Sequence, residues 1–107
     1  MFYKCDIELS KLKGVSKSIN LERVKEIYTS IKKEGLKYSV LIDEKYNVYL
    51  GNTRITALKL LRKKPNYLVS CIMYSKKPIE GAQLTDEKQI CKKLNMRDMK
   101  NIYGFFK

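Results

Sequence analysis

The spacing of apolar and polar positions divides the chain into short segments of two different periods. Residues 3–9 alternate, which predicts a strand, because successive side chains of a strand point to opposite faces. From Asn20 the period changes to three or four residues, which predicts an amphipathic helix. Asn20 is a suitable N-cap for this helix, and Gly35 is a suitable residue to end it. Its apolar stripe consists of Leu21, Val24, Ile27, Tyr28 and Ile31.

Two further strands and a second helix follow. Residues 40–42 and 46–50 are apolar runs on either side of the polar turn 43–45, which predicts a hairpin. A helical pattern then covers residues 53–63, and the apolar residues 67–74 predict another strand. The order strand, helix, strand, strand, helix, strand indicates an α+β fold in which helices cover a small mixed sheet.

The last third of the chain has a more helical pattern. Asp86 is a suitable N-cap for one helix, and Asn95 is a suitable N-cap for a second, shorter one. The final apolar positions are expected to dock on the protein's own core, and the alternative is that they join a partner or form a homodimer. We therefore predict one domain, with a core at residues 1–75 and a helical C-terminal extension at residues 76–107.

Composition narrows the chemistry that this domain can perform. The chain has 107 residues, 44% of them hydrophobic, with three cysteines and no histidine. Soft metal ligands are too few for a zinc site, and catalysis by Ser-His-Asp or Cys-His is excluded. No signal peptide and no apolar run of membrane-spanning length is present. We therefore expect a cytoplasmic protein with no membrane partner.

The net charge of +12, from 23 basic and 11 acidic residues, suits a polyanionic partner such as a nucleic acid. The alternative is a solvated lysine-rich surface, because the lysine pairs are dispersed along the chain. The basic residues that we consider candidates for binding nucleic acid are Arg62, Lys63, Lys64, Lys76 and Lys77.

The most informative motif joins the second strand of the hairpin to the next helix. Its sequence is Gly51-Asn52-Thr53-Arg54, which we call the Gly51 box. A strand that leads through a glycine directly into a helix leaves unpaired N–H groups at the positive end of the helix dipole, and these favour an anion. Arg54 falls on the apolar stripe of this helix, so its charge needs a negative partner. A bound phosphate would satisfy both requirements.

Three pieces of the chain together resemble a known family. The first helix ends in Ser-Ile-Lys-Lys-Glu-Gly-Leu at residues 30–36, a Val-Leu-Ile-Asp strand follows at 40–43, and the Gly51 box then opens a helix. This order and spacing resemble the ParB/sulfiredoxin superfamily, in particular the ParB-like N-terminal domain, also described as a ParB-like nuclease domain. The resemblance covers roughly residues 7–73 and implies a ParB/sulfiredoxin-like fold.

The resemblance implies a role for each position of the Gly51 box in binding the phosphates of a nucleotide. Gly51 would allow close approach of the backbone, and Arg54 would be the main cation. The amides of residues 52–54 would surround the phosphate, with added donors from Asn52 and Thr53 and a weaker contribution from Thr56. The alternative for Asn52 and Thr53 is helix capping, which is compatible with phosphate binding.

Departures from the family pattern limit the expected activity. ParB proteins usually have Gly-Glu-Arg-Arg where this chain has Gly-Asn-Thr-Arg, which argues against nucleotide hydrolysis. Sulfiredoxins carry a catalytic cysteine and a histidine inside the box. Because Asn52 and Thr53 occupy those positions, sulfinic-acid reduction is excluded. About thirty residues follow Met73, too few for the helix-turn-helix that follows in ParB.

Three functions therefore remain open. The first is a stand-alone ParB-like domain that binds DNA or a nucleotide phosphate through the Gly51 box and a basic surface. The second is an enzyme, either a metal-dependent nuclease or a phosphotransferase that uses a nucleoside triphosphate with Mg²⁺. The third is a protein-interaction module. The carboxylates that could serve the second alternative are Asp6, Glu8, Asp43 and Glu44.

Overall fold

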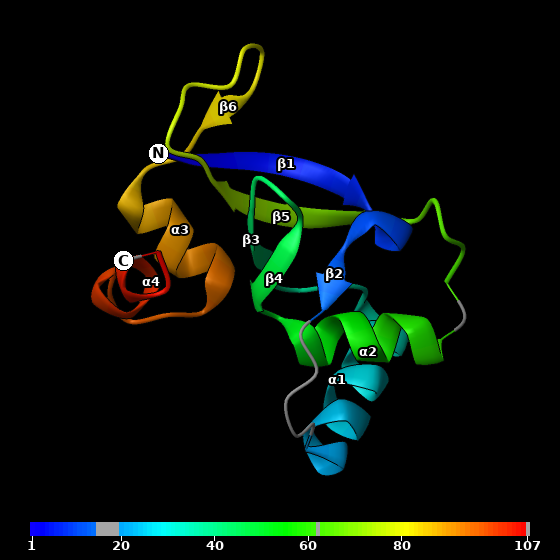
Figure 1. Cartoon of the computed structure of the whole chain (residues 1–107). Helices are drawn as coiled ribbons and strands as arrows, with labels where there is room; N and C mark the ends of the chain where they lie inside the picture. The colour runs from blue at the N-terminus through cyan, green and yellow to red at the C-terminus, as the bar shows by residue number, and fades with distance from the viewer. Residues whose placement is uncertain (15–19, 62, 107) are drawn as a thin grey trace.

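Strands that are far apart in the sequence meet in one mixed sheet (Figure 1). The computed structural model describes residues 1–14, 20–61 and 63–106. Within these residues the sheet has six strands in the order β2-β4-β3-β5-β1-β6. The bounds are β1 (Phe2–Glu8), β2 (Lys13–Gly14), β3 (Val40–Asp43), β4 (Asn47–Leu50), β5 (Leu68–Tyr74) and β6 (Gln83–Leu84). Strand β5 pairs antiparallel with β1 and parallel with β3, so the sheet is mixed as predicted.

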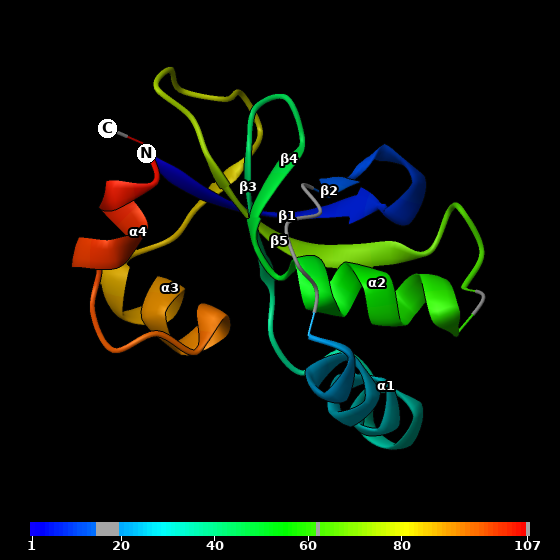
Figure 2. The ribbon, with the colours of Figure 1, turned by 60° about the horizontal axis from the view of Figure 1, so that its bottom comes forward.

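Helices cover both faces of this sheet (Figures 1 and 2). Their bounds are α1 (Leu21–Glu34), α2 (Asn52–Leu60), α3 (Glu87–Leu94) and α4 (Lys100–Gly104), with a 3₁₀ turn at Leu9–Lys11. On β3, Val40 and Ile42 pack with α1 and α2, whereas Leu41 packs with α3 and α4. This alternation follows from the period of two along a strand. The predicted α+β fold is confirmed.

Helix α1 begins and ends where its capping residues predict. The Asn20 side chain accepts hydrogen bonds from the N–H groups of Glu22 and Arg23, and Gly35 ends the helix with φ +78°. The predicted apolar stripe was wrong at Leu21, which is 72% exposed. Leu21 is the first helical residue, and the buried part of the stripe starts one turn later at Val24.

The segment after β5 differs from its prediction in two places. Asn95 does not begin a helix but ends α3 in a left-handed conformation, with φ 56° and ψ 48°. Asparagine tolerates this conformation better than most residues, which makes it a suitable C-terminal cap. The segment also contributes strand β6, which pairs with β1. Asp86 caps α3 as predicted, accepting from the N–H of Gln89.

The apolar end of the chain docks on the protein's own sheet. Met99 and Ile102 are buried in the same cluster as Leu41 and Ile72. Phe106 is half-buried and stacks on Tyr74 with 4.2 Å between ring centroids. Of the final residues 103–106, which were expected to dock on the core, Phe106 does so, whereas Tyr103 and Phe105 remain 41% and 40% exposed. No helix in the described part of the chain is both long and apolar enough to cross a bilayer.

Candidate phosphate-binding site

The junction between β4 and α2 depends on Gly51. This residue has φ +104° and ψ 13°, a backbone conformation that L-residues with a side chain rarely adopt. A Cβ atom at this position would lie 2.4 Å from Cγ1 of Val40. A glycine is therefore required both by its own torsion angles and by the close approach of β3.

The first turn of α2 has no side-chain cap. Asn20 and Asp86 cap α1 and α3, whereas Gly51 occupies the capping position of α2. The first hydrogen bond across the Gly51 box runs from the N–H of Ile55 to the carbonyl of Gly51, at 3.0 Å. The N–H groups of residues 52–54 precede that bond, in the part of a helix that favours anions.

Arg54 is a half-buried cation held by neutral groups. Its Nη1 donates a hydrogen bond to the carbonyl of Ser39 at 3.1 Å, and its guanidinium lies 5.4 Å from the ring centroid of Tyr38. Burial lowers the pKa of Arg54 below its ordinary value, the neighbouring charge of Arg23 lowers it further, and Tyr38 acts in the opposite direction. Burial and the charge of Arg23 both disfavour the charged form of Arg54. An anion bound next to the guanidinium would stabilise that charged form.

A cavity of about 240 Å³, which we call the Gly51 cavity, opens beside these residues. Helix α1 contributes Arg23, the Gly51 box contributes Gly51, Thr53 and Arg54, and the end of α3 contributes Asn95. A neighbouring hollow of about 110 Å³ shares Arg23 and Arg54 and adds Lys37 and Tyr38. None of the described residues that line either space is an aspartate or a glutamate.

Two predicted site residues direct their side chains elsewhere. Asn52 donates from Nδ2 to the carbonyl of Val48 at 3.3 Å, and the hydroxyl of Thr56 donates to the carbonyl of Asn52 at 2.9 Å. Neither side chain lines the Gly51 cavity. The structure thus brings Gly51, Thr53 and Arg54 together at the Gly51 cavity, whereas the side chains of Asn52 and Thr56 are directed away from it.

The predicted basic residues do not gather around this cavity. Lys63 and Lys64 lie between α2 and β5, whereas Lys76 and Lys77 follow the far end of β5. A strand of seven residues separates the two pairs, roughly 23 Å at the usual rise of a strand. Arg62 lies outside the described residues.

The cations that do flank Arg54 were missed by sequence reasoning. Arg23 comes from α1 and Lys37 from the loop that follows it. The only signal for Arg23 is its position four residues before Ile27 on the apolar stripe, at the edge of the face that packs on α2. Which residues of α2 it would meet depends on the packing of the two helices, and no local pattern encodes that packing.

The four candidate catalytic carboxylates are not arranged around the Gly51 cavity. Asp6 and Glu8 lie on β1, and Asp43 and Glu44 lie at the turn between β3 and β4. Among the described residues, no three acidic or cysteine side chains come close enough to hold a metal ion. The metal-dependent alternative therefore gains no support from this arrangement.

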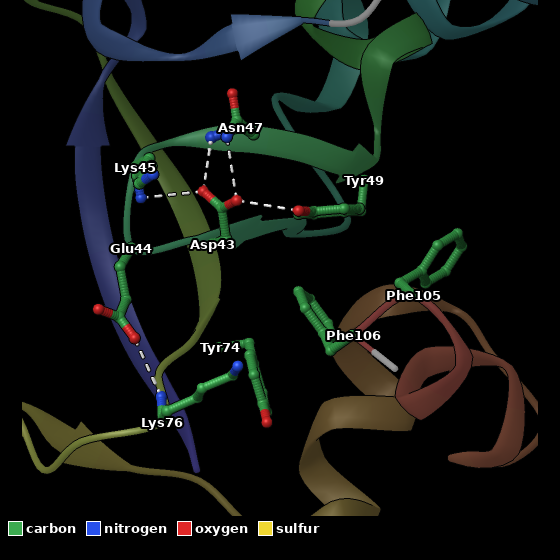
Figure 3. A pocket seen from close by; sticks show the side chains of 9 residues that line it. All are labelled: Asp43, Glu44, Lys45, Asn47, Tyr49, Tyr74, Lys76, Phe105 and Phe106. Atoms are coloured by element: carbon green, nitrogen blue, oxygen red, sulfur yellow. Dashed lines mark hydrogen bonds between the residues drawn. The ribbon is translucent and has the colours of Figure 1, made fainter.

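Asp43 instead organises the β3–β4 turn. Its Oδ1 accepts from the N–H groups of Lys45 and Asn47, and its Oδ2 accepts from Nδ2 of Asn47 and the hydroxyl of Tyr49 (Figure 3). Burial by itself would raise the pKa of Asp43, but these hydrogen bonds outweigh burial and lower the pKa.

Replacing Asp43 by asparagine is expected to destabilise the domain by about 1–2 kcal/mol at neutral pH. Because the folded-state pKa of Asp43 is lowered, its contribution is fully present above the unfolded pKa of about 3.9 and is lost as pH falls through the folded pKa. The difference in Tm between wild type and Asp43→Asn should thus shrink below about pH 4. Thermal unfolding followed by circular dichroism between pH 2.5 and 7 measures this difference. A difference that stays constant over that range would contradict the role of the carboxylate.

Comparison with known proteins shows what this architecture is similar to. No protein-family model matches the chain, and no curated protein matches it. Solved structures do match, among them two of pNOB8-like ParB N-domains. One superimposes over 69% of this chain with a TM-score of 0.59 and 20% identity, and the other over 70% with a TM-score of 0.53 and 16% identity. The chain has the fold of a ParB N-domain.

At this identity the comparison establishes the fold alone. The ParB N-domain fold agrees with the resemblance drawn from the Gly51 box, the helix before it and the strand between them. The chain spans less than a third of each of the two solved chains, 29% in both cases. The function of the ParB-like domain therefore has to be argued from its own residues.

Proposed function

We propose that this ParB-like domain binds a phosphate group, presented by a nucleotide or by DNA, in the Gly51 cavity. Arg54 is the main cation, Arg23 is the second, and the first-turn amides of α2 supply further donors. One observation carries the proposal. Arg54 is half-buried beside another arginine, and none of the described residues that line the cavity they share is a carboxylate.

The charges that meet at the Gly51 cavity favour a bound anion. The guanidinium groups of Arg54 and Arg23 repel each other, and Arg54 also loses part of its hydration because it is half-buried. Within the described part of the chain, the Arg54 side chain makes one hydrogen bond, to the carbonyl of Ser39, although a guanidinium has five N–H donors. A phosphate accepts several of these donors at once and balances both charges, and charge-assisted hydrogen bonds of this type are the strong ones.

The shape of the site favours the phosphates of a nucleotide over the flat side of a duplex. The Gly51 cavity is a concave space of about 240 Å³, and concave sites usually hold small ligands. If Mg²⁺ takes part, it would arrive with the nucleotide, because none of the described residues lining the cavity is a carboxylate. Lys63 and Lys64, at the other end of α2, do not extend this site.

A thermal-shift screen tests the proposal. Inorganic triphosphate, nucleoside triphosphates with and without Mg²⁺, and a short duplex DNA are each added to wild type and to Arg54→Ala. A ligand at a hundred times its Kd stabilises the folded state by about 2.7 kcal/mol, a shift of several degrees in Tm. We expect triphosphates to shift wild type and to shift Arg54→Ala by about half as much or less, because a tenfold higher Kd lowers the stabilisation to about 1.4 kcal/mol at the same ligand concentration.

Control variants distinguish binding in the Gly51 cavity from non-specific attraction of anions to a basic protein. Lys59→Ala removes an exposed cation from α2 and should respond as wild type does. Equal shifts in wild type and Arg54→Ala would contradict binding in the Gly51 cavity. A response to duplex DNA that depends on Arg54, without a response to triphosphates, would assign the phosphate to DNA.

A further inference from the structure

A second and larger cavity lies at the hairpin end of β4, whereas the Gly51 cavity lies where β4 ends. Its volume is about 490 Å³, and it is open to solvent and bordered by the β3–β4 turn, the end of β5 and the residues that follow α4 (Figure 3). We call it the hairpin cavity. None of the residues that line it also lines the Gly51 cavity, so the two are separate places for a ligand.

Aromatic rings form one wall of the hairpin cavity. Phe106 stacks on Tyr74, with 4.2 Å between centroids and 20° between planes, and meets Tyr49 edge-on at 4.8 Å. Phe105 lies 5.9 Å from Tyr49 and is 40% exposed. Phe105 thus lies beside Tyr49 at the edge of this cluster and remains accessible to solvent. An accessible ring next to packed aromatic rings is a suitable surface for stacking another flat ring.

Lysines and carboxylates form the opposite wall, and the carboxylates are already engaged. Both oxygens of Asp43 accept hydrogen bonds from within the turn, and Oε1 of Glu44 accepts from the backbone N–H of Lys76 at 3.0 Å. The donors in these hydrogen bonds are backbone N–H groups, the Asn47 amide and the Tyr49 hydroxyl, and none is a lysine ammonium group. Lys45 and Lys76 are exposed at the mouth of the cavity (Figure 3), and Lys77 adjoins it in sequence.

A cationic ligand fits this arrangement poorly. An aromatic cage binds a quaternary ammonium through its ring faces, whereas here two ammonium groups stand at the opening, and both oxygens of Asp43 and one of Glu44 already accept hydrogen bonds. The net charge of +12 also repels a cation. A flat ring joined to a phosphate fits better, because the ring can stack while the phosphate meets the lysines.

We propose that the hairpin cavity binds an unpaired base of a single-stranded nucleic acid. The base stacks against Phe105 within the Tyr49, Tyr74 and Phe106 cluster, and the neighbouring phosphates contact Lys45 and Lys76. Stacking on aromatic side chains with lysine contacts to the backbone is the usual mode of sequence-tolerant single-strand binding. This site does not depend on phosphate binding in the Gly51 cavity.

Fluorescence anisotropy of a labelled twelve-nucleotide oligo-dT tests the proposal. We expect Phe105→Ala to weaken binding about fivefold or more, the range measured for loss of one stacked base, and Phe105→Tyr to bind as wild type does. Lys76→Gln should weaken binding and reduce its dependence on salt. Lys88→Gln, the same charge change at an exposed position of α3, should leave binding within about twofold, the effect of one distant surface charge. The folded state of every variant is checked by its Tm.

The outcomes are distinguishable from those for the Gly51 cavity. Equal affinity of wild type, Phe105→Ala and Phe105→Tyr for oligo-dT would overturn the proposal, whatever Arg54→Ala does with triphosphate. An equal loss of affinity for single-stranded and duplex DNA in Phe105→Ala would overturn it too, because a paired base cannot enter the cavity. Absence of oligo-dT binding by wild type at low salt is a third contradictory result.

Discussion

Gly51→Ala is expected to lower the free energy of unfolding by about 2–4 kcal/mol, the largest stability effect of any single methyl group added to a described glycine. Two causes add at this position. The φ angle of +104° is unfavourable for alanine, and the new Cβ would lie 2.4 Å from Cγ1 and 2.9 Å from Cβ of Val40. Val40 is fully buried in the central part of the sheet, so it has little room to move. Urea unfolding, or a fall in Tm of about 8 °C or more, measures the effect.

Two other glycines separate the two causes. Gly35 has φ +78° but no atom within 4 Å of an added Cβ, so Gly35→Ala should cost only about 1 kcal/mol through its torsion angle. Gly104 has neither a positive φ nor a close neighbour, and Gly104→Ala should change stability by less than about 0.5 kcal/mol. If Gly51→Ala is no more destabilising than Gly35→Ala, the close contact with Val40 is not a real constraint.

Arg54→Ala is expected to weaken triphosphate binding about tenfold or more while changing stability by less than about 1 kcal/mol. Loss of a hydrogen bond to a charged group accounts for the loss of affinity. Stability changes little because two effects oppose each other. The variant loses the hydrogen bond to Ser39 and the contact with Tyr38, but it also relieves the repulsion from Arg23 and the cost of burying a charge. Residues that serve binding rather than folding often behave in this way.

Two further variants refine this prediction. Arg54→Lys keeps the charge but loses the planar set of donors, so its affinity should fall between those of wild type and Arg54→Ala. Arg23→Ala should weaken binding less than Arg54→Ala, because Arg23 is exposed and Arg54 is half-buried. Isothermal titration calorimetry and thermal unfolding measure the two quantities separately. A large loss of stability with unchanged affinity would instead make Arg54 a structural residue.

Local features of this fold could be predicted from the sequence because they depend on neighbouring residues. Asn20 caps α1, and Gly35 ends it, through contacts within one turn of the chain. Gly51 and Arg54 could be named as candidate site residues for the same reason, because the strand, the glycine and the apolar stripe of the helix follow one another within a short stretch of sequence. Asn95 was misassigned because asparagine suits both ends of a helix, and only the surrounding structure decides which end it occupies.

Features that depend on packing could not be predicted. Arg23 reaches Arg54 only because α1 packs beside α2, and the lysine pairs fall at opposite ends of β5 because of the strand's length. The hairpin cavity combines Tyr49 with Phe105, which are more than fifty positions apart in the sequence. No period or motif connects residues at such a separation.

Binding of a phosphate in the Gly51 cavity is the central claim, and a nuclear magnetic resonance titration tests it most directly. Uniformly ¹⁵N-labelled protein is titrated with inorganic triphosphate, and backbone amide and arginine Nε–H signals are followed. We expect the largest shifts at the amides of Thr53 and Arg54 and at the side chains of Arg54 and Arg23, with Phe105 and Lys76 unaffected. Shifts spread over Lys63, Lys64, Lys76 and Lys77 without the Gly51 box, or no shifts at millimolar triphosphate, would contradict the claim.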